Sequence, residues 1–157
     1  QLLGRADKAE SLITTMMNYI RDTESLRFAR RDDPKKTVAV YNENGLYGAP
    51  DTLIQDMLKY VNVENAATKA GVKWSYMGKK DDLIKADPDV IIVPADVKAP
   101  GFNRDAVLNS YYNDPALKNV KAIKNKKVVI ISNEAMMAKT YHIGRGIYNM
   151  AQFVYER

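Results

Sequence analysis

Aromatic and basic side chains follow several apolar, β-branched runs in this chain of 157 residues. An aromatic wall that carries a few basic groups suits a large, partly apolar and anionic ligand. We therefore expect the ligand-binding residues to be Tyr41, Tyr47, Lys98, Phe102, Arg104, Met136, Lys139, Tyr141 and His142.

The common patterns of catalytic and phosphate-binding sites are absent from the sequence. His142 is the single histidine, and no G-x-S-x-G elbow presents a serine to it. The loop with Gly45 and Gly48 contains neither G-x-G-x-x-G nor G-x-x-x-x-G-K-[ST]. The sequence therefore offers no motif for nucleophilic catalysis or for binding a dinucleotide or nucleotide phosphates, and no cofactor is expected. For His142 a structural or solvent-facing role is favoured, and a ligand contact or a haem-coordinating role stays open.

No metal site is expected from the sequence. The absence of cysteine excludes disulfides, thiolate metal sites and thiol nucleophiles. Asp81, Asp82, Asp87 and Asp89 crowd one stretch, but they precede an apolar run and lack EF-hand spacing. They would lie at the end of the sheet away from a ligand, so we interpret Asp87 as a turn residue and the others as surface residues.

Charge and hydropathy narrow the classes of partner. The 24 Lys and Arg residues against 19 Asp and Glu residues give a net charge of +5, which favours anionic ligands or surfaces. No dense basic stripe alternates with aromatic residues, so nucleic-acid binding is not expected. No apolar run approaches the roughly 20 residues that span a membrane. Because the chain begins at Gln1 without a signal peptide, we interpret it as an excised segment or a processed product.

A sheet must position the stretches that carry the candidate ligand-binding residues. Its central strand is indicated by residues 86–94, Ala-Asp-Pro-Asp-Val-Ile-Ile-Val-Pro. The run from Val90 to Val93 fits a strand that is buried on both faces, as in parallel sheets covered by helices. Pro88 should end the helix before it, and Pro94 should end the strand. Ligands of open α/β sheets bind beyond the carboxyl ends of the strands, so residues 94–103 are the first place to look for a site.

Strand-like and helix-like segments alternate along the chain. We expect strands at residues 37–41, 72–76, 90–93 and 128–132, and helices at residues 50–61, 80–86, 103–111, 115–123 and 141–155. This alternation predicts an α/β fold, a three-layer α/β/α domain with a mainly parallel sheet and helices on both faces.

A long helix over residues 2–30 is predicted to precede this domain. Its apolar stripe, at spacings of three and four, is formed by Leu2, Ala6, Ala9, Ile13, Met16 and Ile20. Leu3, Leu12, Met17 and Tyr19 make the stripe wider than one packing surface needs. We therefore expect part of the apolar face to be exposed or covered by a neighbouring molecule.

In their order and spacing, these segments resemble the carboxyl-terminal lobe of class III substrate-binding proteins of ABC transporters. Residues 3–10, Leu-Gly-Arg-Ala-Asp-Lys-Ala-Glu, resemble the start of that family's interlobe helix. Residues 82–93 and 115–128 resemble its two most recognisable segments. Residues 58–66 resemble the end of a helix and its turn, although Asn62 and Val63 stand where the family usually has paired glycines.

The resemblance implies two lobes joined by a stiff helix, with a ligand held between them and no catalysis. Residues 1–33 would be the interlobe helix and residues 34–157 the carboxyl-terminal, Rossmann-like lobe, with the amino-terminal lobe absent from this sequence. The protein would be extracytoplasmic, either periplasmic or a lipoprotein with a signal peptide, anchored on the outer face of the cytoplasmic membrane. The permease would be its membrane partner, with Asp51, Asp56 and Glu64 as candidate docking residues.

Members of the family bind ferric siderophores, haem or cobalamin. We expect a ferric siderophore here, because the basic and tyrosine side chains named above could supply cationic and hydrogen-bonding groups. Haem or cobalamin is the alternative within the family, with Tyr47, Tyr141 or His142 as the haem ligand. A lobe of a two-lobed α/β enzyme is the second class of hypothesis, although no acid–base pair at the strand ends supports it.

Overall fold

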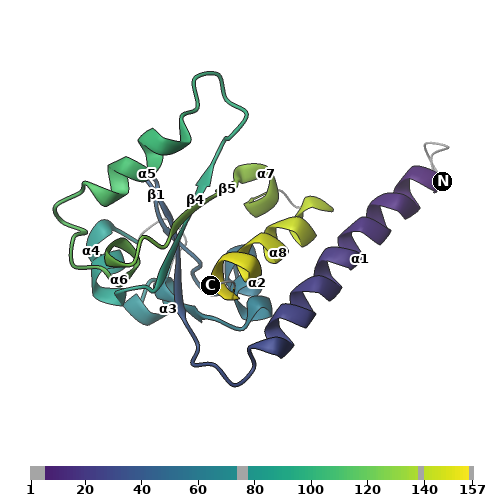
Figure 1. Ribbon diagram of the computed structural model, residues 1–157, viewed down its shortest axis with the longest axis horizontal. Coiled ribbons are helices and arrows are strands. Elements are labelled where there is room, and N and C mark those ends of the chain that lie inside the picture. Colours follow the sequence, from purple (N-terminus) through teal and green to yellow (C-terminus); the bar gives the residue numbers. More distant parts are fainter. Residues whose placement is uncertain (1–5, 74–77, 138–139, 156–157) are drawn as a thin grey trace.

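A computed structural model describes residues 6–73, 78–137 and 140–155. Its sheet contains three parallel strands, β1 (Thr37–Asn42), β4 (Val90–Ala95) and β5 (Val128–Ser132), with β4 in the middle. The short strand β2 (Gly45–Tyr47) pairs antiparallel with β1, and β3 (Glu64–Asn65) pairs parallel with its first residues. The predicted α/β class with a mainly parallel sheet is confirmed (Figure 1).

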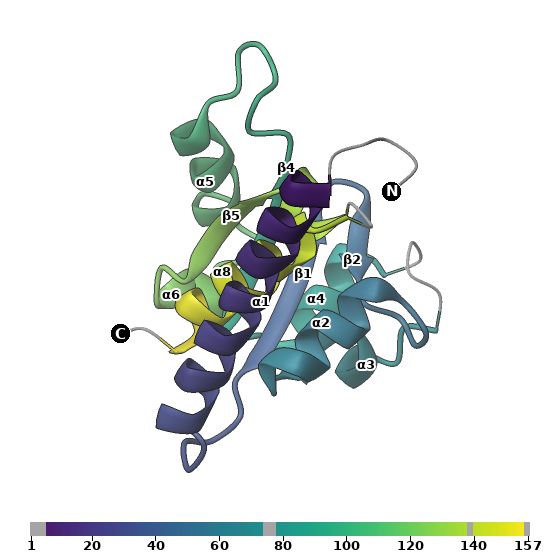
Figure 2. The ribbon, with the colours of Figure 1, turned by 90° about the vertical axis from the view of Figure 1, so that its right-hand side faces the viewer.

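Helices cover both faces of this sheet, as the alternation of segments predicted. One face carries α3 (Ala66–Ala70), α4 (Lys80–Ala86), α5 (Arg104–Tyr112) and α6 (Lys121–Lys124), and the other carries α2 (Leu53–Val61), α7 (Asn133–Met136) and α8 (His142–Tyr155) (Figure 2). Neighbouring strand residues serve opposite cores: Ile91 packs with the first group and Ile92 with the second. Both are fully buried, which explains why β4 is a continuous apolar run.

Asp89 fixes the register between β1 and β4. Its backbone N–H donates to the Thr37 carbonyl at 2.8 Å, and its carboxylate accepts from the Thr37 N–H at 2.8 Å. Asp87 takes a left-handed conformation at the end of α4. The stretch before Val90 is thus built from turn and pairing residues, and it brings the strands together in parallel.

The helix α1 (Ala6–Ala29) packs on α8, on the side away from the sheet (Figure 1). Tyr19 and Tyr148 meet with ring centroids 5.5 Å apart. Ile13, Met17 and Phe28 are 56%, 55% and 68% exposed, so the expected exposure of apolar surface is confirmed within the described residues. The packed face agrees with the predicted stripe only in part. Met16 and Ile20 of the stripe are half-buried, but Ala6, Ala9 and Ile13 are exposed. Leu2 and Leu3 lie outside the described residues.

Two local predictions are wrong among the described residues. Val72 and Lys73 form no strand, and the rest of the predicted strand 72–76 lies outside the described residues. Residues 115–120 form successive turns rather than a helix, with the Leu117 N–H bonded to the Asp114 carbonyl and the Val120 N–H to the Leu117 carbonyl. Only α6, at residues 121–124, remains of that helix.

A third prediction, that Pro94 ends its strand, is also wrong, because β4 continues to Ala95. The Ile91 N–H points to β5, where it bonds the Lys127 carbonyl, so the N–H position of residue 94 faces β1 by the alternation of a strand. The β1–β4 ladder runs only as far as the pair Val40–Ile92. A missing donor at Pro94 therefore costs no ladder bond, and β4 continues beside β5 to Ala95.

Among the described residues, no helix combines the length and the apolar character that a membrane crossing requires.

Candidate functional site

Two adjoining hollows lie at the carboxyl ends of the parallel strands. The first, of about 580 Å³, is lined by the ends of β1 and β4 and by α5, with Tyr41, Phe102 and Tyr111 among its walls. The second, of about 570 Å³, lies between β2, the start of α2 and α7, and includes Tyr47 and Met136. Asn42, Asn44 and Asn133 line both hollows. The position agrees with the rule for ligands of open α/β sheets.

Asn42 stabilises the ridge between the two hollows, which is formed by the residues that line both of them. It is buried, and its side-chain Nδ2 donates to the Pro94 carbonyl at 3.3 Å. Its Oδ1 accepts from the Asn44 N–H at 2.9 Å and from the Tyr47 hydroxyl at 3.1 Å. One amide thus links the end of β1 to β4 and to the β1–β2 turn, and it satisfies its own buried polar atoms.

Two tyrosines form the inner wall of the first hollow. The rings of Tyr41 and Tyr111 meet edge to face, with centroids 6.2 Å apart, and the Tyr111 hydroxyl donates to the Tyr41 carbonyl at 3.2 Å. Burial raises the pKa of both phenols, so they stay neutral at physiological pH. At the rim, the Lys80 ammonium contacts Asp114 at 2.6 Å. This wall offers aromatic faces and a neutralised charge pair.

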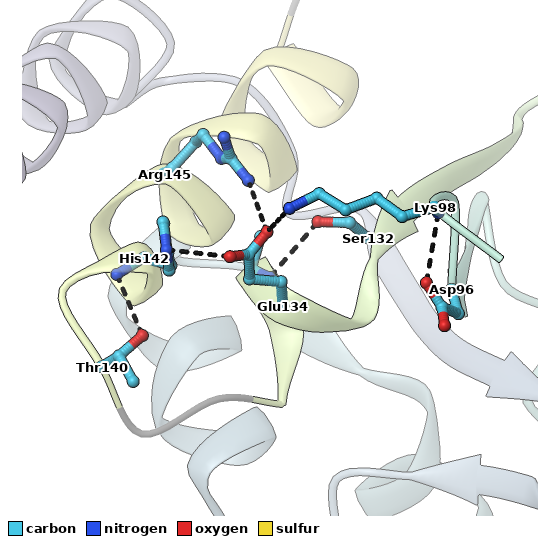
Figure 3. Close-up of polar contacts among 8 residues, drawn as sticks. Asp96, Lys98, Ser132, Glu134, Thr140, His142 and Arg145 are labelled. Carbon is cyan, nitrogen blue, oxygen red and sulfur yellow. Dashed lines mark hydrogen bonds and ion pairs between the residues drawn. The ribbon is translucent and has the colours of Figure 1, made fainter.

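A cluster of charged side chains surrounds Glu134 on α7, next to Asn133, which lines both hollows (Figure 3). The Lys98 ammonium donates to Glu134 Oε2 at 2.9 Å, and His142 Nε2 lies 3.0 Å from Oε1. Arg145 Nη2 lies 3.8 Å from Oε2. The hydrogen bond from Lys98 lowers the pKa of Glu134, and the charges of His142, Lys98 and Arg145 add to this shift. Two permanent cations and a histidine therefore share a single carboxylate.

The remaining predicted ligand-binding residues lie in different places. Phe102 borders the first hollow and also a groove of about 380 Å³ beside β5, where Arg104 and Arg145 lie. Arg104 thus lines the groove rather than the hollows. Tyr141 is exposed and its ring lies 4.1 Å from that of His142. Lys139 lies outside the described residues.

The three candidate docking carboxylates do not share one surface. Asp51 borders the second hollow, with a left-handed φ of 64°. Asp56 is on α2, 3.7 Å from the Lys59 ammonium. Glu64 lies at the opposite end of the sheet, where it accepts from the Thr37 hydroxyl at 2.5 Å. That hydrogen bond and the nearby Lys69 lower the pKa of Glu64.

Sequence reasoning missed Asn42 and Arg145, and of the stretch from Asn133 to His142 it selected neither Asn133 nor Glu134 as a ligand contact. Asn133 and Glu134 directly follow the apolar run of β5, which is the same signal that singled out the loop after β4. Arg145 lies three residues after His142, so a helix that begins near residue 142 places both on one face. In the described part of the chain, no three or more His, Asp or Glu side chains are arranged to hold a metal ion.

Acidification is expected to destabilise the protein. Lys98 lowers the pKa of Glu134, and Lys80 together with the Ala116 N–H lowers that of Asp114. A carboxyl group with a lower pKa in the folded state stabilises that state above its unfolded pKa of about 4, and this contribution is lost as the pH falls through the folded pKa. The melting temperature measured by circular dichroism should therefore stay level from about pH 7 to 5 and drop below about pH 4. Replacing Asp114 with Asn should make the drop in melting temperature below about pH 4 smaller. An unchanged drop would contradict the role given to Asp114.

The sequence matches the family described as Periplasmic binding protein over residues 1–135. No significant match was found among curated proteins. Among solved structures, the periplasmic heme-binding protein RhuT from Roseiflexus sp. RS-1 is similar, with 19% identity and a TM-score of 0.75 over 99% of this chain and 59% of that one. A periplasmic binding protein from Veillonella parvula DSM 2008 has 17% identity and a TM-score of 0.75 over 96% and 46%. An ABC-type Fe3+-hydroxamate transport system protein from Saccharomonospora viridis DSM 43017 has 17% identity and a TM-score of 0.73 over 98% and 51%.

These likenesses agree with the fold described above, and the chain spans about half the length of each of these structures, from 46% to 59%. The family match covers most of the sequence, including α1, the strands of the described sheet, and Lys98 and Glu134 of the charged cluster. The chain therefore belongs to the periplasmic binding protein family.

Proposed function

We propose that this chain is the interlobe helix and carboxyl-terminal lobe of a two-lobed solute-binding protein of an ABC importer. Residues 1–33 would form the interlobe helix, residues 34–157 the second lobe, and an amino-terminal lobe would precede them in the same polypeptide. The length ratio to the similar structures supports this division. The exposed Ile13, Met17 and Phe28 on α1 support it further, because they offer an apolar surface for another body.

The ligand that we propose is a ferric siderophore, held between the lobes over the two hollows. One observation carries this choice: Lys98, Arg145 and His142 share the single carboxylate of Glu134, which directly follows Asn133, a residue that lines both hollows. The cluster has a surplus of positive charge, and the first hollow has polar and aromatic walls. Such a surface suits a bulky chelate whose iron-binding groups are anionic.

Haem is less directly supported as a ligand. A haem ligand would have to present a free ring nitrogen or a phenolate to the iron. The Tyr47 hydroxyl donates to Asn42, and Nε2 of His142 lies 3.0 Å from Glu134, which leaves Nδ1 of that ring for an iron. The similar protein from Roseiflexus sp. RS-1 is described as heme-binding, so haem belongs among the test ligands.

The proposed protein works outside the cytoplasmic membrane, either in the periplasm or attached by a lipid anchor, and delivers its ligand to the permease. Asp51 and Asp56 are better placed to dock on that permease than Glu64. Asp51 lies at the rim of the second hollow and Asp56 is exposed on the helix that starts there, whereas Glu64 lies at the far end of the sheet.

Ligand binding by the full two-lobed protein tests this function. We expect an anionic ferric tris-catecholate or a neutral ferric tris-hydroxamate to quench the fluorescence of Trp74 and the tyrosines at micromolar concentration or below. Residues 1–157 alone should bind about 100-fold more weakly or not at all, because one wall of the cleft is missing and each 1.4 kcal/mol lost is tenfold in affinity. Circular dichroism checks that the shorter chain is folded. Tight quenching by haem or cobalamin and by no ferric siderophore would refute the ligand but leave the family unchanged.

A further inference from the structure

Glu134 lies among basic side chains that could also bind an anionic group of a ligand. It sits in the first turn of α7, after Ser132, whose hydroxyl accepts from the Ala135 N–H at 3.3 Å. Its side chain is 35% exposed, and its cationic neighbours come from two elements. Lys98 comes from the segment between β4 and α5, and His142 and Arg145 come from the start of α8 (Figure 3).

We propose that Glu134 is an internal counter-ion that competes with the ligand for Lys98 and Arg145, and so sets the preference of the protein between anionic and neutral ferric complexes. This inference rests on the proposed function. A ligand carboxylate or phenolate can replace Glu134 as the partner of these cations. The carboxylate therefore weakens the binding of anionic complexes and has little effect on neutral ones.

The local geometry allows this exchange of partners. The Lys98 side chain is 77% exposed, while its backbone N–H donates to Asp96 Oδ1 at 3.1 Å. The backbone is thus held in place and the long side chain is able to move. Exposed ion pairs contribute only about 0–1 kcal/mol, so giving up the contact with Glu134 costs little. Asp96 also lines the first hollow, so the backbone of Lys98 is held next to the ligand-binding surface.

The test compares Glu134→Gln with the wild type in the full two-lobed protein. The two probes are an anionic ferric tris-catecholate and a neutral ferric tris-hydroxamate of similar size. Removing the competing carboxylate should tighten the binding of the anionic probe about fivefold, the upper end for an exposed ion pair, and that of the neutral probe less than about twofold. Asp105→Asn is the matched control, because it removes one negative charge from an exposed position on α5. It should change neither affinity.

Lys98→Met provides a second variant at an exposed site, in case the first does not fold. It should weaken the anionic probe about tenfold and the neutral probe by a clearly smaller factor. An equal gain for both probes, or weaker anionic binding in Glu134→Gln, would overturn the inference, because Glu134 would then act only by shaping the rim. If the wild type binds neither probe, the proposed function itself fails and this inference falls with it.

Discussion

Replacing Gly146 with alanine is expected to lower the free energy of unfolding by about 3 kcal/mol. A Cβ atom at this position would lie 2.1 Å from the Ala135 carbonyl oxygen and 3.0 Å from Met57 Cε. The oxygen belongs to the backbone of α7, so the clash cannot be relieved by a side-chain rotation. Helix propensity alone predicts the opposite sign, because alanine is favoured over glycine by about 1 kcal/mol inside a helix. The close approach of α8 to α7 decides the sign.

Urea unfolding at constant pH measures this loss. Asn149→Ala is the control on the same helix, and it should change the free energy of unfolding by less than about 0.5 kcal/mol. Gly146→Ala should also impair ligand binding, because α7 carries Glu134 and α8 carries His142 and Arg145. A variant that is as stable as the wild type, or more stable, would show that the two helices can separate at no cost.

The elements whose apolar residues pack into the core were predicted well from the sequence. The strands at 90–93 and 128–132 and the helix at 80–86 appear close to their predicted bounds. Their apolar residues have no alternative to the core, so pattern and structure agree. The extent of β4 past Pro94 could not be predicted in this way, because it depends on which neighbouring strand the missing N–H would face.

The two short strands that pair with β1, β2 and β3, could not be predicted either. Short pairings such as β2 and β3 depend on turn geometry more than on composition. The hairpin pairs Asn42 with Gly45 across a two-residue turn, and a run as short as Gly45–Tyr47 carries little strand signal of its own. The predicted helix at 115–123 failed because the carboxylate of Asp114 accepts from the Ala116 N–H at 2.9 Å. That bond favours a turn at Pro115, where the sequence predicted the start of a helix.

For the site, the sequence predicted the edge of the sheet but not the pairing of charges there. Lys98 and His142 were selected as separate ligand contacts, and the structure brings both to one carboxylate. The distance of 36 residues between Lys98 and Glu134 gives no sequence periodicity to detect. Only the parallel arrangement of β4 and β5 puts the segments that follow them next to each other.

Replacing Asn42 with aspartate is expected to cost about 3 kcal/mol of stability at neutral pH. The introduced carboxylate would keep the contacts from the Asn44 N–H and the Tyr47 hydroxyl, but it would lose the donor to the Pro94 carbonyl and place a buried negative charge against that oxygen. Burial would raise the pKa of the new carboxyl group above its unfolded value.

The loss should therefore shrink as the pH falls, because a group with a raised folded pKa favours the folded state below its unfolded pKa of about 4, and this benefit is lost as the pH rises through the folded pKa. Protonated, it can again donate to Pro94. Asn44→Asp is the matched control: the same chemical change, two residues away, at an exposed side chain. Urea unfolding at about pH 7 and pH 5 should show a large, pH-dependent loss for the first variant and less than about 0.5 kcal/mol for the second. Equal losses in both would mean that the Asn42 amide does not hold the ridge between the two hollows.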